Sequence, residues 1–246
     1  MSIDEVAFTA AVATLGFLSG ATAAIIGFGI GSLLTPLLIT RIDPHLAVSI
    51  IAVPHALATG VRYFQHRAAV DSRLLMKFGL PCAGGALLGA SLQAALTGGG
   101  LVFVLGALLI ATGLANLSRA YRAWNPPPTA AFALGSVSGF FGGLAGNQGG
   151  FRTAGLTAFS LPPRAFLATG TAVALLVDLA RTPVYLVRSG AQLSEFTGII
   201  VAASAGCVLG TIAGERVLLG LSTDQYRRVV GIAVLIVGVW LCVQGR

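Results

Sequence analysis

The chain consists of apolar segments separated by short polar or glycine-rich stretches. Several segments are as long as the ~20 apolar residues that a helix needs to cross a membrane. Two of them, 30–40 and 153–162, are too short to cross alone. None shows the alternation of a membrane β-barrel, so the pattern predicts an all-α polytopic membrane protein. The segments cover residues 5–26, 30–40, 45–61, 78–97, 100–118, 129–145, 153–162, 166–187, 196–214 and 229–244.

Composition supports this prediction. The chain has 246 residues, of which 56% are hydrophobic and 9% charged, and its mean hydropathy is +0.90. A soluble domain carries roughly 25% charged residues. The formal net charge is +7, but the basic residues lie in short loops, as in loops retained in the cytoplasm. We therefore expect the lipid bilayer as a partner and no nucleic acid. Cys82, Cys207 and Cys242 lie in apolar runs without ligand spacing, which predicts buried structural thiols and no metal site.

An offset of 119 residues aligns special positions of the two halves of the chain. Their order predicts two homologous halves of four to five apolar segments each. The first repeat would cover residues 1–122, a proline-rich linker 123–128, and the second repeat 129–246. The aligned positions are Ser19-Gly20 with Ser138-Gly139, Gly27 with Gly146, Gly31 with Gly150, Pro44 with Pro163 and Arg62 with Arg181; after a slip of two residues, Gly85 aligns with Gly206 and Gly89 with Gly210.

The distribution of arginine and lysine predicts the orientation of the first half and leaves two alternatives for the second. The first-half basic residues are Arg62, Arg67, Arg73, Lys77, Arg119 and Arg122, and their loops should share the cytoplasmic side. An odd number of crossings per half would invert the second half, and an even number would not. The inverted arrangement places Arg164, Arg216, Arg227 and Arg228 inside, and the other places Arg181, Arg188 and Arg246 inside. We favour inverted halves.

Glycines recur every four residues in the apolar segments 78–97 and 196–214. Gly85 and Gly89 share one helix face, and so do Gly206, Gly210 and Gly214. Such faces allow two helix backbones to approach closely. We expect static packing there, with a sliding surface as the alternative.

Two glycine-rich breaks interrupt the apolar pattern at matching places, residues 27–31 and 146–150. Irregular backbone at membrane depth is tolerated only inside protein or beside a water-filled cavity. If each break starts the short helix that follows, Gly31 to Thr40 or Gly150 to Ser160, the free N–H groups and positive end of that helix suit an anion. We therefore expect the broken helices to meet near the bilayer midplane and form a transport site. The alternative is a kink that serves close packing.

Arg152 ends the second glycine-rich stretch, two residues beyond Gly149-Gly150. A charge near the bilayer centre costs about 2.5–3.5 kcal/mol on insertion scales, so it has a partner or a function. The planar guanidinium matches oxyanions. Asn147 and Gln148 can donate amide hydrogens to the same ligand. A structural salt bridge between Arg152 and Asp178 is the alternative.

Two further titratable residues lie inside apolar segments. Asp178 is three residues before Arg181 in one predicted helix, which favours an internal ion pair, and proton transfer is the other interpretation. His55 lies two turns before Arg62 on the same face and could bind an anion or carry a proton, and a hydrogen-bonded core histidine is the alternative. Nothing in the spacing links His55 to Asp178. The chain has no phosphate-binding loop, His-Glu-x-x-His or nucleophile elbow, so we predict neither an enzyme nor a cofactor.

The residues around the first break resemble the sulfite exporter TauE/SafE family, also called the toluene sulfonate uptake permease (TSUP) family. The resemblance rests on Phe-Leu-Ser-Gly at 17–20, Gly-Phe-Gly-Ile-Gly-Ser-Leu-Leu-Thr-Pro at 27–36 and Pro54-His55 running to Arg62-Tyr63-Phe64. It implies a multi-pass secondary transporter of sulfur-containing anions in the bacterial inner membrane. Family members commonly carry a Gly-Gly-Gly run in the second half. The Gly-Asn-Gln-Gly-Gly-Phe-Arg at 146–152 indicates a divergent branch.

We therefore expect a permease for small anions, either sulfur oxyanions such as sulfite or organosulfonates. Alternatives are a passive anion channel and a permease for another organic anion such as a carboxylate. The expected partner is the small anionic substrate, and a homodimer remains an open alternative. The expected substrate-binding residues are Gly29, Gly31, Asn147, Gln148, Gly149, Gly150, Arg152 and His55, with Asp178 and His55 as candidates for proton coupling.

Overall fold

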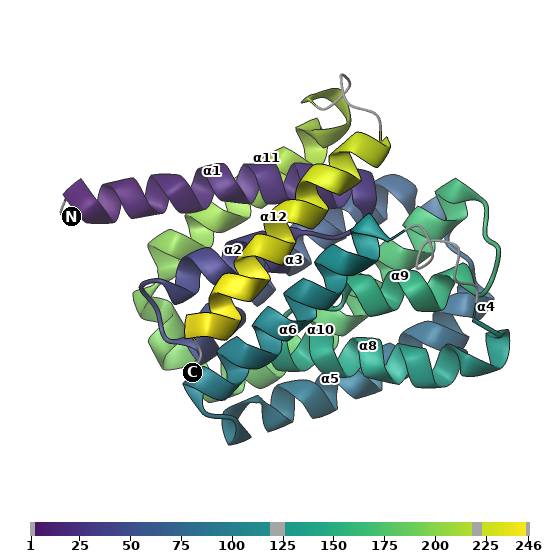
Figure 1. Cartoon of the computed structure of the whole chain (residues 1–246), viewed down its shortest axis with the longest axis horizontal. Coiled ribbons are helices and arrows are strands. Elements are labelled where there is room, and N and C mark those ends of the chain that lie inside the picture. Colours follow the sequence, from purple (N-terminus) through teal and green to yellow (C-terminus); the bar gives the residue numbers. More distant parts are fainter. Residues whose placement is uncertain (1–2, 119–125, 218–222, 245–246) are drawn as a thin grey trace.

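The computed structural model describes residues 3–118, 126–217 and 223–244, most of which are helical (Figure 1). The first half contains α1 (Ile3–Ile26), α2 (Ile30–Ile39), α3 (Pro44–His66), η1 (Arg67–Ala69), α4 (Ser72–Leu74), the π-helical turn η2 (Leu75–Gly79), α5 (Leu80–Leu92), η3 (Gln93–Ala95) and α6 (Gly98–Leu117). The second half contains η4 (Pro128–Ala130), α8 (Ala131–Ala145), α9 (Gly149–Thr157), α10 (Pro163–Glu195), α11 (Thr197–Val217) and α12 (Thr223–Gln244).

Within these residues, eight helical stretches are long and apolar enough to cross a membrane. They correspond to the long apolar segments of the sequence, and α2 and α9 correspond to the two short ones. The prediction of an all-α polytopic membrane protein is confirmed. The helix predicted to start at Gly150 begins at Gly149 and ends at Thr157. The chain leaves the helix through a turn in which the Ser160 amide donates to the Thr157 carbonyl at 3.3 Å and Ser160 takes φ 45°.

The protein buries charge and exposes apolar side chains. Phe132 and Val187 are 70% and 90% exposed, whereas Arg152 and Arg181 are 4% and 2% exposed. This distribution suits a helix bundle whose outer surface faces lipid and whose interior holds the polar groups.

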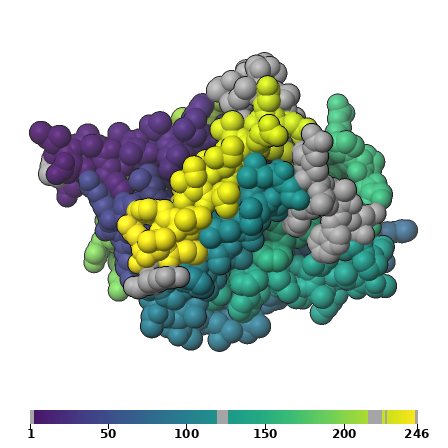
Figure 2. Space-filling view, viewed as in Figure 1, coloured from purple at the N-terminus to yellow at the C-terminus, as the bar shows by residue number. Residues whose placement is uncertain are grey.

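The three cysteines do not share one environment. Cys82 and Cys207 are buried free thiols, as expected, but Cys242 is partly exposed. The expectation was wrong for Cys242, which lies in the last turn of α12, a helix on the outer surface of the bundle beside α6 (Figure 2).

The two halves pack against each other reciprocally. The helix that starts each half packs against the third long helix of the other half, so that α1 lies on α11 and α8 lies on α5. A side chain at Gly20 would meet the Cys207 backbone, and one at Gly139 would meet the Cys82 backbone. The internal symmetry expected from the 119-residue offset is therefore present in the packing. The linker at 123–128 and its boundaries stay predictions, because residues 119–125 lie outside the described part.

The predicted slip of two residues after the third helix was wrong. Gly85 faces Ser136 and Phe140, whereas Gly210 faces Phe17, which lies 119 positions before Ser136. The equivalent of Gly85 is therefore Gly210 rather than Gly206, at an offset of 125. The six additional residues of the second half follow Arg181, where α10 continues to Glu195.

Equivalent helices run in opposite directions. On α6 and α12, Gly106 faces Gly238 and Gly113 faces Gly231, so the pair is antiparallel. Figure 1 shows these two helices side by side. Within the first half, α2 returns to the start of α1, because Arg41 donates to the Asp4 carbonyl at 3.2 Å. Because α1 begins and α2 ends on the same side, α3, α5 and α6 are the three helices that change sides in the first half. This number is odd, and the prediction of inverted halves is confirmed.

The inverted arrangement gathers most basic residues on one face of the bundle. In the described chain, this basic face carries Arg67, Arg73, Lys77, Arg164, Arg227 and Arg228, while the opposite face carries Arg41 and Arg188. Arg62 is not a loop residue, as the orientation argument assumed, because α3 continues past it and buries it. Arg181 is likewise buried within α10 and does not report on topology.

Two neighbouring glycines of α5 provide a direct test of the close packing. An added Cβ at Gly85 would meet Phe140 N at 2.9 Å, whereas one at Gly84 would meet nothing within 4 Å. We expect Gly85→Ala to destabilise the protein by ~1–3 kcal/mol, as overpacking does. Gly84→Ala should be neutral or stabilise by up to ~1 kcal/mol through helix propensity. Unfolding in detergent would measure both, and equal stabilities would contradict the packing.

Candidate functional site

Each glycine-rich break begins where a long helix ends in a left-handed glycine. Gly27 has φ 85° and Gly146 has φ 72°, a conformation that glycine adopts without steric cost. The Gly27 amide donates to the Ala23 carbonyl at 3.0 Å, and the Gly146 amide donates to the Gly142 carbonyl at 3.1 Å. The two breaks are thus closed in the same way, 119 residues apart. Both then turn back into a short helix, α2 or α9.

The two breaks lie against each other. A side chain at Gly31 would collide with the Gly146 carbonyl, and one at Gly149 would collide with Phe28. The glycines are therefore needed for close approach as well as for the turn. Close packing and a binding site are therefore compatible here, because the glycines that pack closely are among the residues predicted to bind the anion.

A small internal cavity of about 10 Å³ lies at this meeting point. It offers room for about one water molecule. Seven of the eight predicted binding residues line it, and Gly150 does not, because Gly150 faces Thr112 of α6 and borders a separate cavity. The lining residues are Phe28, Gly29, Gly31, Ser32, His55, Gly146, Asn147, Gln148, Gly149 and Arg152.

Both short helices begin at this cavity without a side-chain cap. The residues that precede them, Gly29 and Gln148, make no capping hydrogen bond. The first N–H groups of a helix have no acceptor within the helix, and its N-terminus carries a partial positive charge. The cavity therefore lies between two positive helix ends.

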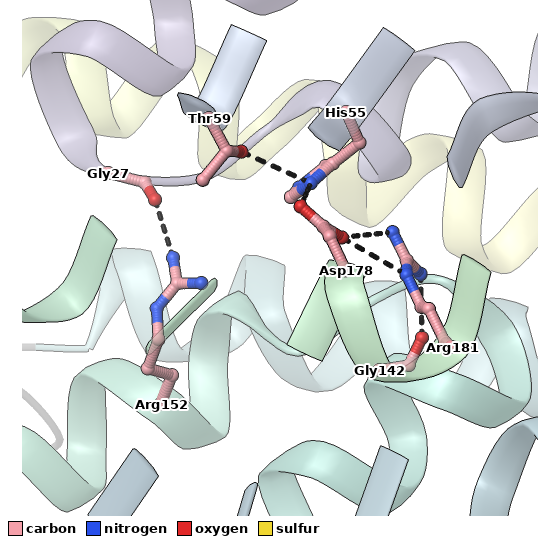
Figure 3. A network of polar contacts seen from close by, with 7 residues as sticks. All are labelled: Gly27, His55, Thr59, Gly142, Arg152, Asp178 and Arg181. Carbon is pink, nitrogen blue, oxygen red and sulfur yellow. Dashed lines mark hydrogen bonds and ion pairs between the residues drawn. The ribbon is translucent and has the colours of Figure 1, made fainter. Parts of the chain in front are cut away.

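Arg152 connects the two halves at the cavity. Its guanidinium Nη2 donates to the Gly27 carbonyl at 2.6 Å, across from α9 to the first break (Figure 3). Its Nη1 is buried and has no hydrogen-bond partner in the described chain. The alternative of a salt bridge with Asp178 is wrong, since Asp178 pairs with two other residues. Arg152 also does not reach toward bulk water, because only 4% of it is exposed.

Asn147 and Gln148 add further unsatisfied polar atoms beside Arg152. They are 5% and 6% exposed, and Asn147 Nδ2 and Gln148 Oε1 lack partners within the described residues. A buried polar group without a hydrogen bond is costly, so such groups mark a place where a ligand or water binds.

His55, Asp178 and Arg181 form a buried polar cluster behind the cavity (Figure 3). His55 Nδ1 lies 2.7 Å from Asp178 Oδ2, and Arg181 Nη2 lies 2.9 Å from Asp178 Oδ1. The predicted pair of Asp178 and Arg181 is confirmed. The contact of His55 with Asp178 was missed, since α3 and α10 bring together residues 123 positions apart. His55 lines the cavity, and Asp178 lies behind it.

Two equivalent arginines support the helix ends at the breaks. Arg62 donates to the Ala23 carbonyl, and Arg181 Nη1 donates to the Gly142 carbonyl at 2.7 Å. The two arginine donors are 119 residues apart in the sequence, and so are the two carbonyl acceptors. These carbonyls are the same ones that accept from Gly27 and Gly146, in the negative last turn of α1 and α8.

Two larger cavities, of about 280 Å³ and 140 Å³, lie toward the basic face, and Arg152 borders the first of them. Arg227 of α12 borders both. Sequence reasoning missed Arg227, Phe28 and Ser32 as lining residues. Two of them could have been identified from the sequence: Phe28 from the glycines on either side of it, and Ser32 from its position in the first turn of α2. Nothing near Arg227 in the sequence distinguishes it from other loop arginines.

Comparison with known proteins gives one match. The chain matches the family described as sulfite exporter TauE/SafE over residues 12–241. No curated protein and no solved structure matched it. Because this match covers nearly the whole chain and all residues of the two breaks, the chain belongs to the sulfite exporter TauE/SafE family and is a membrane transporter of sulfite-like anions.

Proposed function

We propose that this chain is a secondary transporter that binds a small sulfur oxyanion, such as sulfite, or an organosulfonate between its two glycine breaks. The observation that carries the proposal is the unpartnered Nη1 of the buried Arg152, next to the unpartnered Nδ2 of Asn147. They lie beside the N-termini of α2 and α9, whose partial positive charge also favours an anion. An anion with several oxygens supplies the missing acceptors.

The balance of buried charge supports an anion. Asp178 compensates Arg181 through a direct ion pair. Arg62 and Arg152 are also buried, and in the described chain each donates to a backbone carbonyl and forms no ion pair. Buried charges are normally paired. A bound anion would provide a counter-charge for these two arginines, which no acidic side chain of the described residues supplies.

The size of the inner cavity implies that transport requires a conformational change. A cavity of about 10 Å³ does not hold an anion of several heavy atoms. We infer that α2 and α9 separate when the anion enters, as in alternating access around a central site. The larger cavities lie on the basic face, which we assign to the cytoplasmic side of a bacterial inner membrane.

The His55–Asp178 contact supports proton coupling as a further part of the proposal. It joins the two halves, lies next to the anion site and contains the two groups with the chemistry to exchange a proton. A proton that binds this pair would change the contact between the halves. Movement of the halves and protonation would then be linked.

Removing the guanidinium at position 152 tests the binding site. We expect Arg152→Gln to weaken sulfite binding about ten- to a hundredfold, because a charge-assisted hydrogen bond contributes roughly 1.5–3 kcal/mol. Arg73→Gln, which removes an exposed arginine of the basic face, is the control and should bind sulfite normally. Thermal stabilisation by sulfite and uptake of radiolabelled sulfite into proteoliposomes measure the effect. Unchanged binding and uptake in Arg152→Gln would remove Arg152 from the site. Flux that never saturates would instead indicate a passive channel.

Proton coupling has its own test at His55. In proteoliposomes with a pH gradient, we expect His55→Gln to retain sulfite binding and to lose sulfite accumulation against its concentration gradient. His66→Gln, which changes a histidine at the end of the same helix, should accumulate sulfite normally. Undiminished accumulation by His55→Gln would exclude this histidine as the proton carrier.

Asp178 also stabilises the fold through its ion pair with Arg181. Asp178→Asn leaves Arg181 without its counter-charge, and breaking a buried ion pair costs about 3–5 kcal/mol. We expect a correspondingly lower unfolding midpoint in detergent. An unfolding midpoint equal to that of the unmodified protein would show that the pair contributes little to stability.

A further inference from the structure

The two larger cavities are neighbours on the basic side of the breaks, and together we call them the outer compartment. Both are bordered by Ile26, Thr153, Phe166 and Arg227. The compartment lies between the end of α1, the short helix α9, the start of α10 and the start of α12. The larger part is about 280 Å³, far more than the inner cavity and close to the ~300 Å³ lower range of small-molecule sites.

The lining combines two cations with an apolar wall. Arg152 and Arg227 supply charge, Thr153 and Thr171 supply hydroxyl groups, and most of the remaining lining is apolar, including Phe166 and Leu167. The start of α10 also borders this compartment, and Pro162 before it makes no side-chain cap. Asp224, one turn before Arg227 on α12, is not among the lining residues. An inorganic oxyanion would use the cations but leave the apolar wall uncovered.

We propose that this compartment is a second anion site, distinct from the inner one, for a small organic sulfonate. Its sulfonate group lies between Arg227 and Arg152, and its apolar body lies against Phe166 and Leu167. Arg152 borders this compartment and is only 4% exposed, so its wall carries a buried charge. The proposal rests on the transport function proposed above and adds an outer station to it.

Arg152 divides the two compartments. It borders both the inner and the outer cavity, while Gly27, whose carbonyl accepts from Arg152, borders only the outer of these two. A Cβ atom added at Gly170 of α10, on the outer side, would lie 3.9 Å from Arg152 Nε. An anion in the outer site competes with the Gly27 carbonyl for this guanidinium. Occupation of the outer site therefore releases a contact between the halves and opens the way inward.

The first experiment compares two adjacent arginines of α12. Arg227 is half-buried in the compartment, and Arg228 is exposed, so Arg227→Gln and Arg228→Gln remove the same charge from the same helix end. We expect benzenesulfonate to bind the protein and Arg228→Gln equally, and Arg227→Gln about tenfold or more weakly. Sulfite, which we place in the inner site after α2 and α9 separate, should bind all three alike. Equal binding of benzenesulfonate by both variants would overturn the proposal.

A second experiment reads the outer site without relying on transport. Thr153→Cys, in a Cys242→Ser background, places a thiol in the compartment. We expect a sulfonate-bearing methanethiosulfonate to react faster than its cationic analogue, benzenesulfonate to slow the reaction, and Arg227→Gln but not Arg228→Gln to remove the preference. A preference that survives Arg227→Gln would overturn the assignment. So would slowing by phosphatidylglycerol but not by benzenesulfonate, which would assign the compartment to a lipid.

The outcomes separate the two proposals. Loss of sulfite binding in Arg152→Gln together with normal benzenesulfonate binding in Arg227→Gln would leave the transport function standing and remove the outer site. Anion-selective labelling of Thr153→Cys without any sulfite transport would support the outer site and contradict the proposed transport of sulfite.

Discussion

Backbone carbonyls at the ends of α1 and α8 lie deep in the bundle, and the structure depends on how they are satisfied. Lipid offers no hydrogen bonds, so groups released where a helix breaks need partners inside the protein. Arginine provides these partners. Arg62 donates to Ala23, Arg181 to Gly142 and Arg152 to Gly27. The breaks can therefore persist at this depth because three buried guanidinium groups support them.

The symmetric part of this support holds the fold, and its departures from symmetry supply the chemistry. Arg62 and Arg181 are equivalent and bond equivalent carbonyls. Arg152 corresponds to Leu33 and Asp178 corresponds to Thr59 at the 119-residue offset, so the cation and the acid at the site belong to the second half alone. Thr59 Oγ1 and Asp178 Oδ2 both contact His55 Nδ1, at 3.3 Å and 2.7 Å. The second half therefore carries a charge where the first half has an apolar or neutral side chain.

Sequence reasoning identified the features that follow from local chemistry. The ten apolar segments, the two breaks and the buried cation at Arg152 are visible because lipid constrains composition residue by residue. The contact of His55 with Asp178 depends on how α3 and α10 cross, which no spacing along the chain encodes. The 125-residue offset was hidden because glycines recur every four residues and match at several slips. Gly150 was misplaced for a related reason: a one-residue shift on a helix turns it by about 100°, enough to face α6 instead of the cavity.

The halves meet at the site through two polar contacts of different chemistry. Arg152 of the second half holds Gly27 of the first, and Asp178 of the second half holds His55 of the first. A ligand shifts a conformational equilibrium only by its different affinity for the two states. An anion that takes the guanidinium from Gly27 has such a difference, because in the closed state it must compete with that carbonyl. A proton has the same kind of difference at the His55–Asp178 pair. Both contacts lie on the interface between the halves, so separating the halves breaks both of them. Binding of the anion and binding of the proton therefore shift the same conformational equilibrium.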